Sequence, residues 1–102
     1  MIDIGLNAKD IQNINSIFAQ HQSVEKVIIY GSRARGDYKP YSDIDLVLIG
    51  ECVDDLTELK IEYELDDLLL PNKFDLAIYN KISNPDLLEH IQVSGKLLYS
   101  RD

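Results

Sequence analysis

Apolar residues recur at helical spacing in three stretches of the chain. In the first of them, the apolar positions lie three or four residues apart, at Ile11, Ile14, Ile17 and Phe18. All three stretches carry residues suited to begin or end a helix. The predicted helices are 7–22, with Asn7 as N-cap; 54–70, with Asp54 or Asp55 as N-cap and Pro71 beyond its end; and 84–95, with Asn84 as N-cap, Pro85 at the first position and Gly95 at the exit.

Other stretches are short, apolar and rich in β-branched or aromatic residues, which predicts strands. These are 25–30, 43–49 and 73–79, with a short edge strand at 97–99. Gly31 ends the first strand, Ser32 is suited to cap a helical turn over 33–36, and a loop around Pro40 follows. The element order predicts one α/β (α+β) domain over 1–102, a small mixed β-sheet of three to four strands flanked by helices.

The charge is concentrated in one part of the chain. The net charge is −8, and residues 51–67 hold eight acids against the single base Lys60. This segment therefore carries a net charge of −7, and the remainder carries −1. A chain so poor in bases is not expected to bind duplex nucleic acid, which requires a Lys/Arg surface. A basic protein partner remains open.

The sequence also indicates a compartment. No apolar run approaches the roughly 20 residues needed to cross a bilayer, and the N-terminus does not resemble a signal peptide. Cys52 is the only cysteine, so it has no partner for an internal disulfide. We therefore expect a cytoplasmic protein with no membrane contact.

Two acidic residues interrupt the apolar strand predicted at 43–49. Asp43 and Asp45 lie at i and i+2, so their side chains leave the same face roughly 6–7 Å apart. Carboxylates this close repel each other unless a cation lies between them, and a hard cation such as Mg²⁺ suits carboxylate oxygens. The simpler alternative is that both acids lie at a strand end and face water.

The strand predicted at 73–79 contains a similar irregularity, because Asp75 interrupts its apolar run. If the two strands are neighbours, Asp75 joins Asp43 and Asp45 as a third metal ligand or as a base. Three carboxylates around two Mg²⁺ ions form a clamp for in-line displacement at phosphorus. Taken alone, Asp75 is also compatible with a strand end that faces water.

Residues suited to bind phosphate lie upstream of these acids. Gly31 and Ser32 begin a turn whose backbone N–H groups and hydroxyl suit phosphate oxygens. Arg33, Arg35 and Lys39 follow as the densest basic cluster in the chain. Arg33 is suited to pair with triphosphate oxygens, whereas Arg35 is equally compatible with facing solvent or Asp37.

Three competing motifs fail at identifiable positions. Gly31 and Gly36 have P-loop spacing, but Asp37 stands where that motif needs Lys. An EF-hand starting at Asp43 would need Gly where Leu48 stands. The phosphatase signature DxDx[TV] fits 43–47, but that fold needs a longer chain with further downstream residues.

Together, Gly31-Ser32 and Asp43-Ile44-Asp45, with Asp75 one strand later, resemble the nucleotidyltransferase superfamily that includes the DNA polymerase β palm. The segment GSRARGDYKPYSDIDLVLI is similar to the minimal nucleotidyltransferases, the MntA-type proteins of prokaryotes. The resemblance implies a nucleotidyltransferase-type sheet over nearly the whole chain. It also implies Mg²⁺, two ions in all, at the metal ligands and catalytic residues Asp43, Asp45 and Asp75, and ATP as substrate. The expected nucleotide-binding residues are Gly31, Ser32, Arg33 and Ser42.

In such families the partner is commonly a helical HEPN protein, and the minimal transferase can AMPylate a tyrosine of that partner. The resemblance therefore implies a protein adenylyltransferase that is the antitoxin of a toxin–antitoxin pair. Two alternatives remain open: a non-catalytic antitoxin that masks its partner, and a small-molecule transferase of the aminoglycoside-modifying type. A chain this short leaves no residues for a domain that presents the acceptor, so a second protein or a homodimer is expected to complete the site.

The acidic helix predicted at 54–70 is a candidate for that contact, because it has two apolar stripes. Leu56, Leu59 and Tyr63 form one stripe, and the other consists of Ile61, Leu65 and Leu68. Such a helix is either packed on both sides within the protein or docked by one side on a partner.

Overall fold

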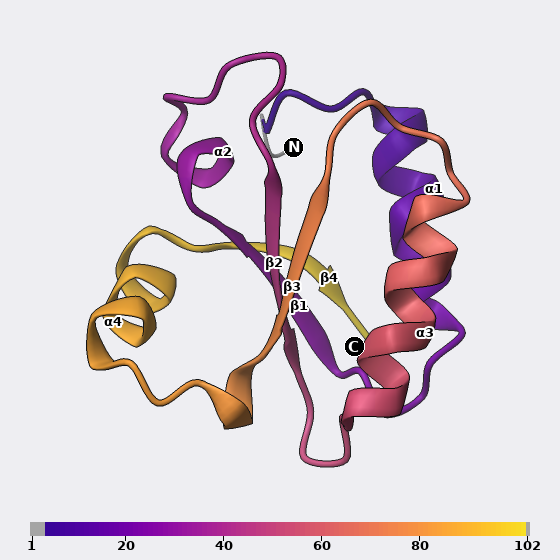
Figure 1. The fold of residues 1–102 in the computed structure, drawn as a ribbon, viewed down its shortest axis with the longest axis vertical. Helices are drawn as coiled ribbons and strands as arrows, with labels where there is room; N and C mark the ends of the chain where they lie inside the picture. The colour runs from indigo at the N-terminus through magenta and orange to yellow at the C-terminus, as the bar shows by residue number, and fades with distance from the viewer. Residues whose placement is uncertain (1–3, 102) are drawn as a thin grey trace.

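A four-stranded mixed sheet forms the centre of the computed structural model, which describes residues 4–101 (Figure 1). The strands are β1 (Lys26–Tyr30), β2 (Ile44–Ile49), β3 (Phe74–Ile78) and β4 (Lys96–Ser100). Their order across the sheet is β3-β2-β1-β4. β1 pairs with β2 and β4 in antiparallel orientation, and β2 pairs with β3 in parallel. The second and third strands are therefore neighbours, as the candidate three-carboxylate site requires.

Helices lie on both faces of this sheet. They are α1 (Ala8–Ala19), α2 (Ser32–Arg35), α3 (Asp55–Asp66) and α4 (Pro85–Ser94). α1 and α3 lie together on one face, and α4 lies on the other, on the same side as the short α2 (Figure 1). The predicted order of elements and the mixed α+β class are confirmed.

The longer helices begin where side chains replace missing backbone partners. Asn7 accepts a hydrogen bond from the amide of Asp10 (2.7 Å), and Asp54 accepts one from Thr57 (2.8 Å). Asn84 accepts from the amide of Asp86 (2.9 Å). Each cap satisfies an amide that has no partner inside its helix.

Several boundaries differ from the predictions. α3 ends at Asp66, not at residue 70, and Leu69 then adopts a left-handed conformation (φ 58°) two residues before Pro71. β2 begins at Ile44, so Asp43 precedes the strand instead of starting it. A 3-10 turn, η1 (Tyr79–Lys81), extends β3 and was not predicted. Propensity does not fix such ends, because local turns compete with the last helical bonds.

The core lies between the sheet and the α1/α3 pair. Alternate residues of β2 point into it, and Ile44, Leu46 and Leu48 are fully buried. On the outer side of the core, α3 contributes Ile61 and Leu65, both fully buried. Period-2 alternation in the strands and a helical stripe in α3 thus meet in one apolar layer.

The two apolar stripes of α3 have different surroundings. The stripe of Ile61 and Leu65 is in the core, whereas Leu56, Leu59 and Tyr63 remain 58%, 44% and 63% exposed. Packing within the protein therefore accounts for only one of the two stripes.

Helices long and apolar enough to span a bilayer are not found among residues 4–101.

A pair of substitutions tests this division of α3. Leu65→Ala is expected to lower the free energy of unfolding by about 2–5 kcal/mol, because it removes a fully buried side chain and leaves a cavity. Tyr63→Ala, two residues away on the exposed stripe, is expected to change it by less than about 0.5 kcal/mol. Urea unfolding followed by circular dichroism measures both values. Equal losses in the two variants would contradict the assignment of the core face.

Candidate active site

The candidate site is built on the hairpin of β1 and β2, whose connecting segment runs from Gly31 to Asp43. Gly31 has a φ of 76°, a conformation that L side chains rarely adopt. A Cβ added at this position would also collide with the Oδ2 atom of Asp45. Glycine is therefore required at position 31 for two reasons: the backbone conformation and the close approach of the Asp45 carboxylate.

Gly31, and not the predicted Ser32, is the N-cap of α2. The Gly31 carbonyl accepts hydrogen bonds from the amides of Ala34 (3.2 Å) and Arg35 (3.1 Å). The Ala34 amide therefore already has a partner within the turn. The amides of Ser32 and Arg33 and the Ser32 hydroxyl are left to donate to phosphate.

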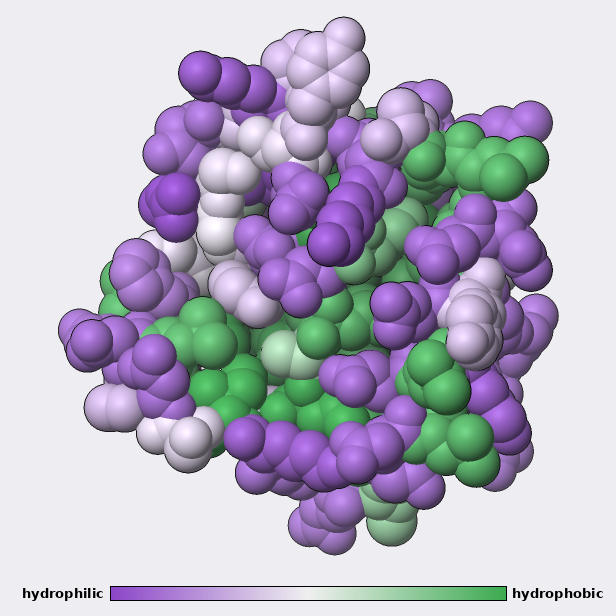
Figure 2. Space-filling view, viewed as in Figure 1, coloured by the Kyte–Doolittle hydropathy of each residue, from purple (hydrophilic) through white to green (hydrophobic). Residues whose placement is uncertain are grey.

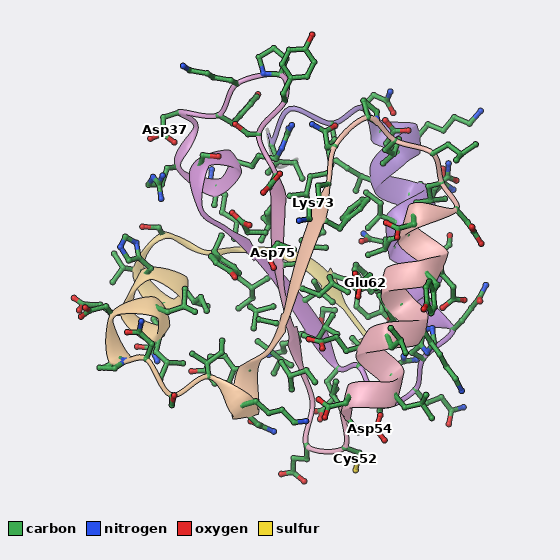
Figure 3. All side chains as sticks on the ribbon, viewed as in Figure 1. Asp37, Cys52, Asp54, Glu62, Lys73 and Asp75 are labelled. Carbon is green, nitrogen blue, oxygen red and sulfur yellow. The ribbon has the colours of Figure 1, made fainter. Side chains whose placement is uncertain are left out.

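Strand register brings the predicted carboxylates to one face of the sheet. Asp45 of β2 is the direct partner of Asp75 in the parallel β2–β3 pair. On its other side, Asp45 is the partner of Tyr30 in the antiparallel β1–β2 pair. Figure 3 shows Asp75 on β3 where that strand lies alongside β2. Tyr30, Asp45 and Asp75 thus form a row across three strands, and Asp43 lies two residues before Asp45.

The charges in this row affect one another. Burial raises the pKa of Asp45, and the neighbouring carboxylates of Asp75 and Asp43 raise it further, while Arg35 lowers it. Burial also raises the pKa of Tyr30 to about 12, with further contributions from Asp45 and Asp75. Among the residues that the structure describes, Arg35 is the cation that lowers the pKa of Asp45.

The donor set fits a hard divalent cation in its chemistry. Asp43, Asp45 and Asp75 supply carboxylate oxygens, the ligands that Mg²⁺ prefers, and repulsion from Asp75 and Asp43 adds to burial in raising the pKa of Asp45. Within residues 4–101, however, no three acidic, histidine or cysteine side chains converge closely enough to hold a metal ion. The carboxylates therefore lie on the same face of the sheet and influence one another electrostatically, but they do not form a closed coordination shell.

Arg33 occupies a different position from the one expected. Its side chain is only 2% exposed, and its guanidinium donates to the carbonyls of Ile4 (2.8 Å) and Ser42 (3.2 Å). It also lies over the ring of Tyr38, 5.0 Å from the ring centre. These contacts engage the guanidinium with backbone carbonyls and do not fit the expected triphosphate contact. Arg33 instead ties the N-terminal segment to the 38–42 loop.

Ser42 belongs to the same support. Its hydroxyl accepts a hydrogen bond from the amide of Lys39 (2.8 Å), and its carbonyl accepts from both Arg33 and Asn72 (3.2 Å each). Asn72 also donates to the carbonyl of Pro40 (2.9 Å). Ser42 thus holds the loop immediately before Asp43, a contribution distinct from the expected nucleotide contact.

Two further residues lie near the carboxylates, and neither was among the predicted site residues. Arg35 is exposed, pairs with Asp37 (3.4 Å) and lies close enough to Asp45 to lower its pKa. The sequence pattern left its direction open. Tyr30 was assigned only to its strand, although it immediately precedes Gly31. Alternation from Ile28 would have placed it on the face opposite the buried Ile29.

Comparison with known proteins identifies the family. The family model for polymerase beta nucleotidyltransferases matches residues 12–102. The chain belongs to this family. Two proteins of Methanocaldococcus jannaschii are related to it across nearly their full length. The one named "Putative protein adenylyltransferase MJ0128" is 36% identical over 92 residues, covering 82% of this chain and 93% of the relative. The one named "Putative protein adenylyltransferase MJ0604" is 28% identical, covering 84% and 90%.

Solved structures share the fold of this nucleotidyltransferase chain. A crystal structure described as a toxin–antitoxin with AMP-PNP superimposes with a TM-score of 0.71 at 20% identity, covering 93% of this chain and 74% of the other. A Shewanella oneidensis structure, described as a tri-AMPylated HEPN toxin in complex with MNT antitoxin, gives a TM-score of 0.68 at 16% identity, covering 90% and 71%. At these identities the likeness establishes the fold.

The two arginines of α2 provide a test of the site's construction. Arg33→Ala is expected to lower the free energy of unfolding by roughly 2–4 kcal/mol, because it removes the donor to the Ile4 carbonyl, one of the donors to the Ser42 carbonyl and the contact with Tyr38. Arg35→Ala, on the exposed side of the same short helix, is expected to cost less than about 0.5 kcal/mol. Chemical unfolding compares them. A stable Arg33→Ala variant would show that the buried guanidinium is not needed to hold the loop.

The raised pKa of Asp45 predicts a pH-dependent stability. Because the folded chain holds this proton more tightly than the unfolded chain, the favourable contribution is present at low pH and is lost as the pH rises through the folded pKa. At pH 7 the ionised carboxylate therefore opposes folding in the absence of metal. Asp45→Asn is expected to raise the free energy of unfolding at pH 7, and to raise it less at pH 3.

Urea unfolding at the two pH values measures the difference, and Asp86→Asn on the exposed first turn of α4 is the control. The control is not expected to gain stability on going to pH 7. An Asp45→Asn gain that is no larger at pH 7 than at pH 3 would exclude uncompensated repulsion in the carboxylate row.

Proposed function

We propose that this nucleotidyltransferase chain moves AMP from ATP to a protein hydroxyl, a tyrosine of a helical HEPN-type partner, as the antitoxin of a toxin–antitoxin pair in the cytoplasm. The observation that carries the chemistry is the register of Asp45 with Asp75, directly beside the glycine that admits the Asp45 carboxylate. The names of the two archaeal relatives and of the Shewanella complex support the protein acceptor and the HEPN partner.

The triphosphate is assigned to the hairpin segment. Gly31 has no side chain to obstruct it, and the amides of Ser32 and Arg33, with the Ser32 hydroxyl, are suited to donate to phosphate oxygens. Arg35 is the exposed cation on this side of the site and lies within electrostatic reach of Asp45. We propose that Arg35, and not Arg33, pairs with the negative charge of the triphosphate.

Asp43, Asp45 and Asp75 are the residues that would hold Mg²⁺. When bound, the metal supplies positive charge that neutralises the triphosphate and makes the α-phosphorus more electrophilic. Mg²⁺ would also offset the repulsion that raises the pKa of Asp45.

The proposed reaction transfers AMP from ATP to the acceptor hydroxyl in one displacement at the α-phosphorus. The acceptor oxygen forms a bond to the α-phosphorus as the bond between that phosphorus and the bridging oxygen to the β-phosphate breaks. Pyrophosphate leaves with the bonding electron pair. The proton of the acceptor hydroxyl passes to a carboxylate, for which Asp75 is the candidate because it is exposed at the edge strand of the sheet.

Removal of two carboxylates tests this assignment. Asp43→Asn with Asp45→Asn is expected to lower transfer of label from α-labelled ATP to the HEPN protein of the adjacent reading frame by at least about a thousandfold. Asp86→Asn is the matched control and is expected to keep full activity. Binding of ATP in the presence of Mg²⁺ should raise the melting temperature of the wild-type chain and not of the double variant.

Transfer that survives the double substitution would rule out the carboxylate mechanism. A partner that is inhibited equally well by the double variant would instead favour the masking antitoxin. Modification of a small hydroxylated compound by the chain alone would favour the small-molecule transferase.

A further inference from the structure

The exposed side of α3 has two parallel rows of different chemistry. Successive residues of an α-helix are about 100° apart, so Leu56, Leu59 and Tyr63 form one strip along the side opposite Ile61 and Leu65. The second row runs along the flank of this strip and is acidic. Its members recur at intervals of three and four residues: Asp55, Glu58, Glu62 and Asp66.

The acidic row lies on the flank of α3 that faces the edge strand β3. Burial and the neighbouring Asp55 and Glu62 raise the pKa of Glu58, and Asp75 contributes to the same rise. Asp55 forms an ion pair with Lys81, which lies just after β3. Figure 3 shows Glu62 on the side of α3 that is nearer β3. The acidic row therefore lies between the apolar strip and β3, the strand that carries Asp75.

The apolar strip is an unusual feature of this surface. Figure 2 shows apolar side chains on the outward side of α3, separated by polar ones from the apolar surface over the sheet. Leu56, Leu59 and Tyr63 are 58%, 44% and 63% exposed, although the same helix is rich in acids. A single exposed leucine is ordinary, but three aligned on one helix face resemble the centre of a protein interface.

We propose that this face of α3 is the docking surface for the protein that presents the acceptor, and that the matching surface is a helix with an apolar row flanked by Lys or Arg. Lys or Arg on the partner would be electrostatically complementary to the acidic row. The acidic row lies beside β3, so a docked partner lies along the strand that carries Asp75, whose side chain is on the opposite face of the sheet from α3. Docking itself is independent of the proposed reaction, whereas the partner's role as acceptor rests on it.

A second copy of the chain is the less favourable occupant of this face. If the apolar strips of two copies met, the acidic row of one would face either the acidic row of the other or its opposite flank. That flank holds Glu64, which contacts His21, and Asp67 beside Lys60, so it has no surplus of positive charge. The first arrangement places like charges together, which costs affinity, and the second offers the acidic row no basic surface.

The test compares surface variants of the full chain in binding to the HEPN protein of the adjacent reading frame by calorimetry. A variant with Leu56→Ser, Leu59→Ser and Tyr63→Ser is expected to bind at least tenfold more weakly. Val93→Ser is the control, because Val93 is 77% exposed on α4. Binding of ATP in the presence of Mg²⁺ should be the same in both variants.

A second variant tests the acidic row without altering the apolar strip. Glu62→Lys with Asp66→Lys is expected to weaken partner binding at least fivefold and to reduce its dependence on NaCl concentration, because screening then acts on fewer attractive pairs. Both residues are exposed, so the fold is expected to persist, and circular dichroism checks this.

The proposal is overturned if the triple-serine variant binds like the wild type, if Val93→Ser loses as much affinity, or if the charge reversal strengthens binding. A wild-type dimer that the triple-serine variant abolishes would overturn the assignment of the occupant. The Asp43→Asn, Asp45→Asn variant separates this inference from the proposed function. It should bind the partner as the wild type does. Loss of docking in the triple-serine variant, with no AMP transfer by the wild type, would uphold the surface and refute the reaction.

Discussion

The buried guanidinium of Arg33 is the contact on which the candidate site depends. A full positive charge inside a small protein is costly unless its donors are satisfied, and here backbone carbonyls from two segments satisfy them. Those segments are the chain around Ile4 and the loop that ends at Ser42, one residue before Asp43. Because Arg33 also belongs to α2, the turn that begins at Gly31 and the first carboxylate are held by the same side chain.

A second constraint acts across the sheet. Gly31 admits the Asp45 carboxylate to a position that no residue with a Cβ would allow, and register places Asp75 and Tyr30 on either side of it. Burial and like charges then raise the pKa of Asp45. The protein thus maintains an electrostatically unfavourable arrangement by means of packing and backbone hydrogen bonds elsewhere, which is common where a site awaits a charged ligand.

Most of the fold could be predicted from the sequence, because its signals are local. Period-2 runs predict the strands, and Asn7, Asp54 and Asn84 predict the helix starts. Asp43 and Asp45 stand out because two acids break an apolar run. The positions that sequence reasoning misassigned depend on distant contacts. Arg33 has the appearance of a phosphate ligand until its carbonyl partners are known, and one of those partners lies 29 residues away.

Arg35 and Tyr30 lie near the carboxylates but were not predicted as site residues, because their placement also depends on tertiary structure. The direction of Arg35 depends on how a four-residue helix is oriented, and a short turn has no periodicity that reveals this. The position of Tyr30 beside Asp45 depends on strand register, which the sequence constrains only through the alternation of apolar and polar residues. The two stripes of α3 were visible in the sequence, but only packing could show that one of them stays outside the core.

The route by which each carboxylate reaches the site has a consequence for folding. Gly31 directly follows β1, and Asp45 lies in β2, the next strand of the hairpin, so their meeting requires the closure of a short loop. Asp75 arrives by a parallel crossover that includes the whole of α3, and this contact closes a longer loop at a greater entropic cost. The hairpin half of the site can therefore form early in folding, and the third carboxylate joins only when α3 packs. Substitutions that destabilise the packing of α3 are therefore expected to impair assembly of the carboxylate site, although the substituted residues do not contact that site.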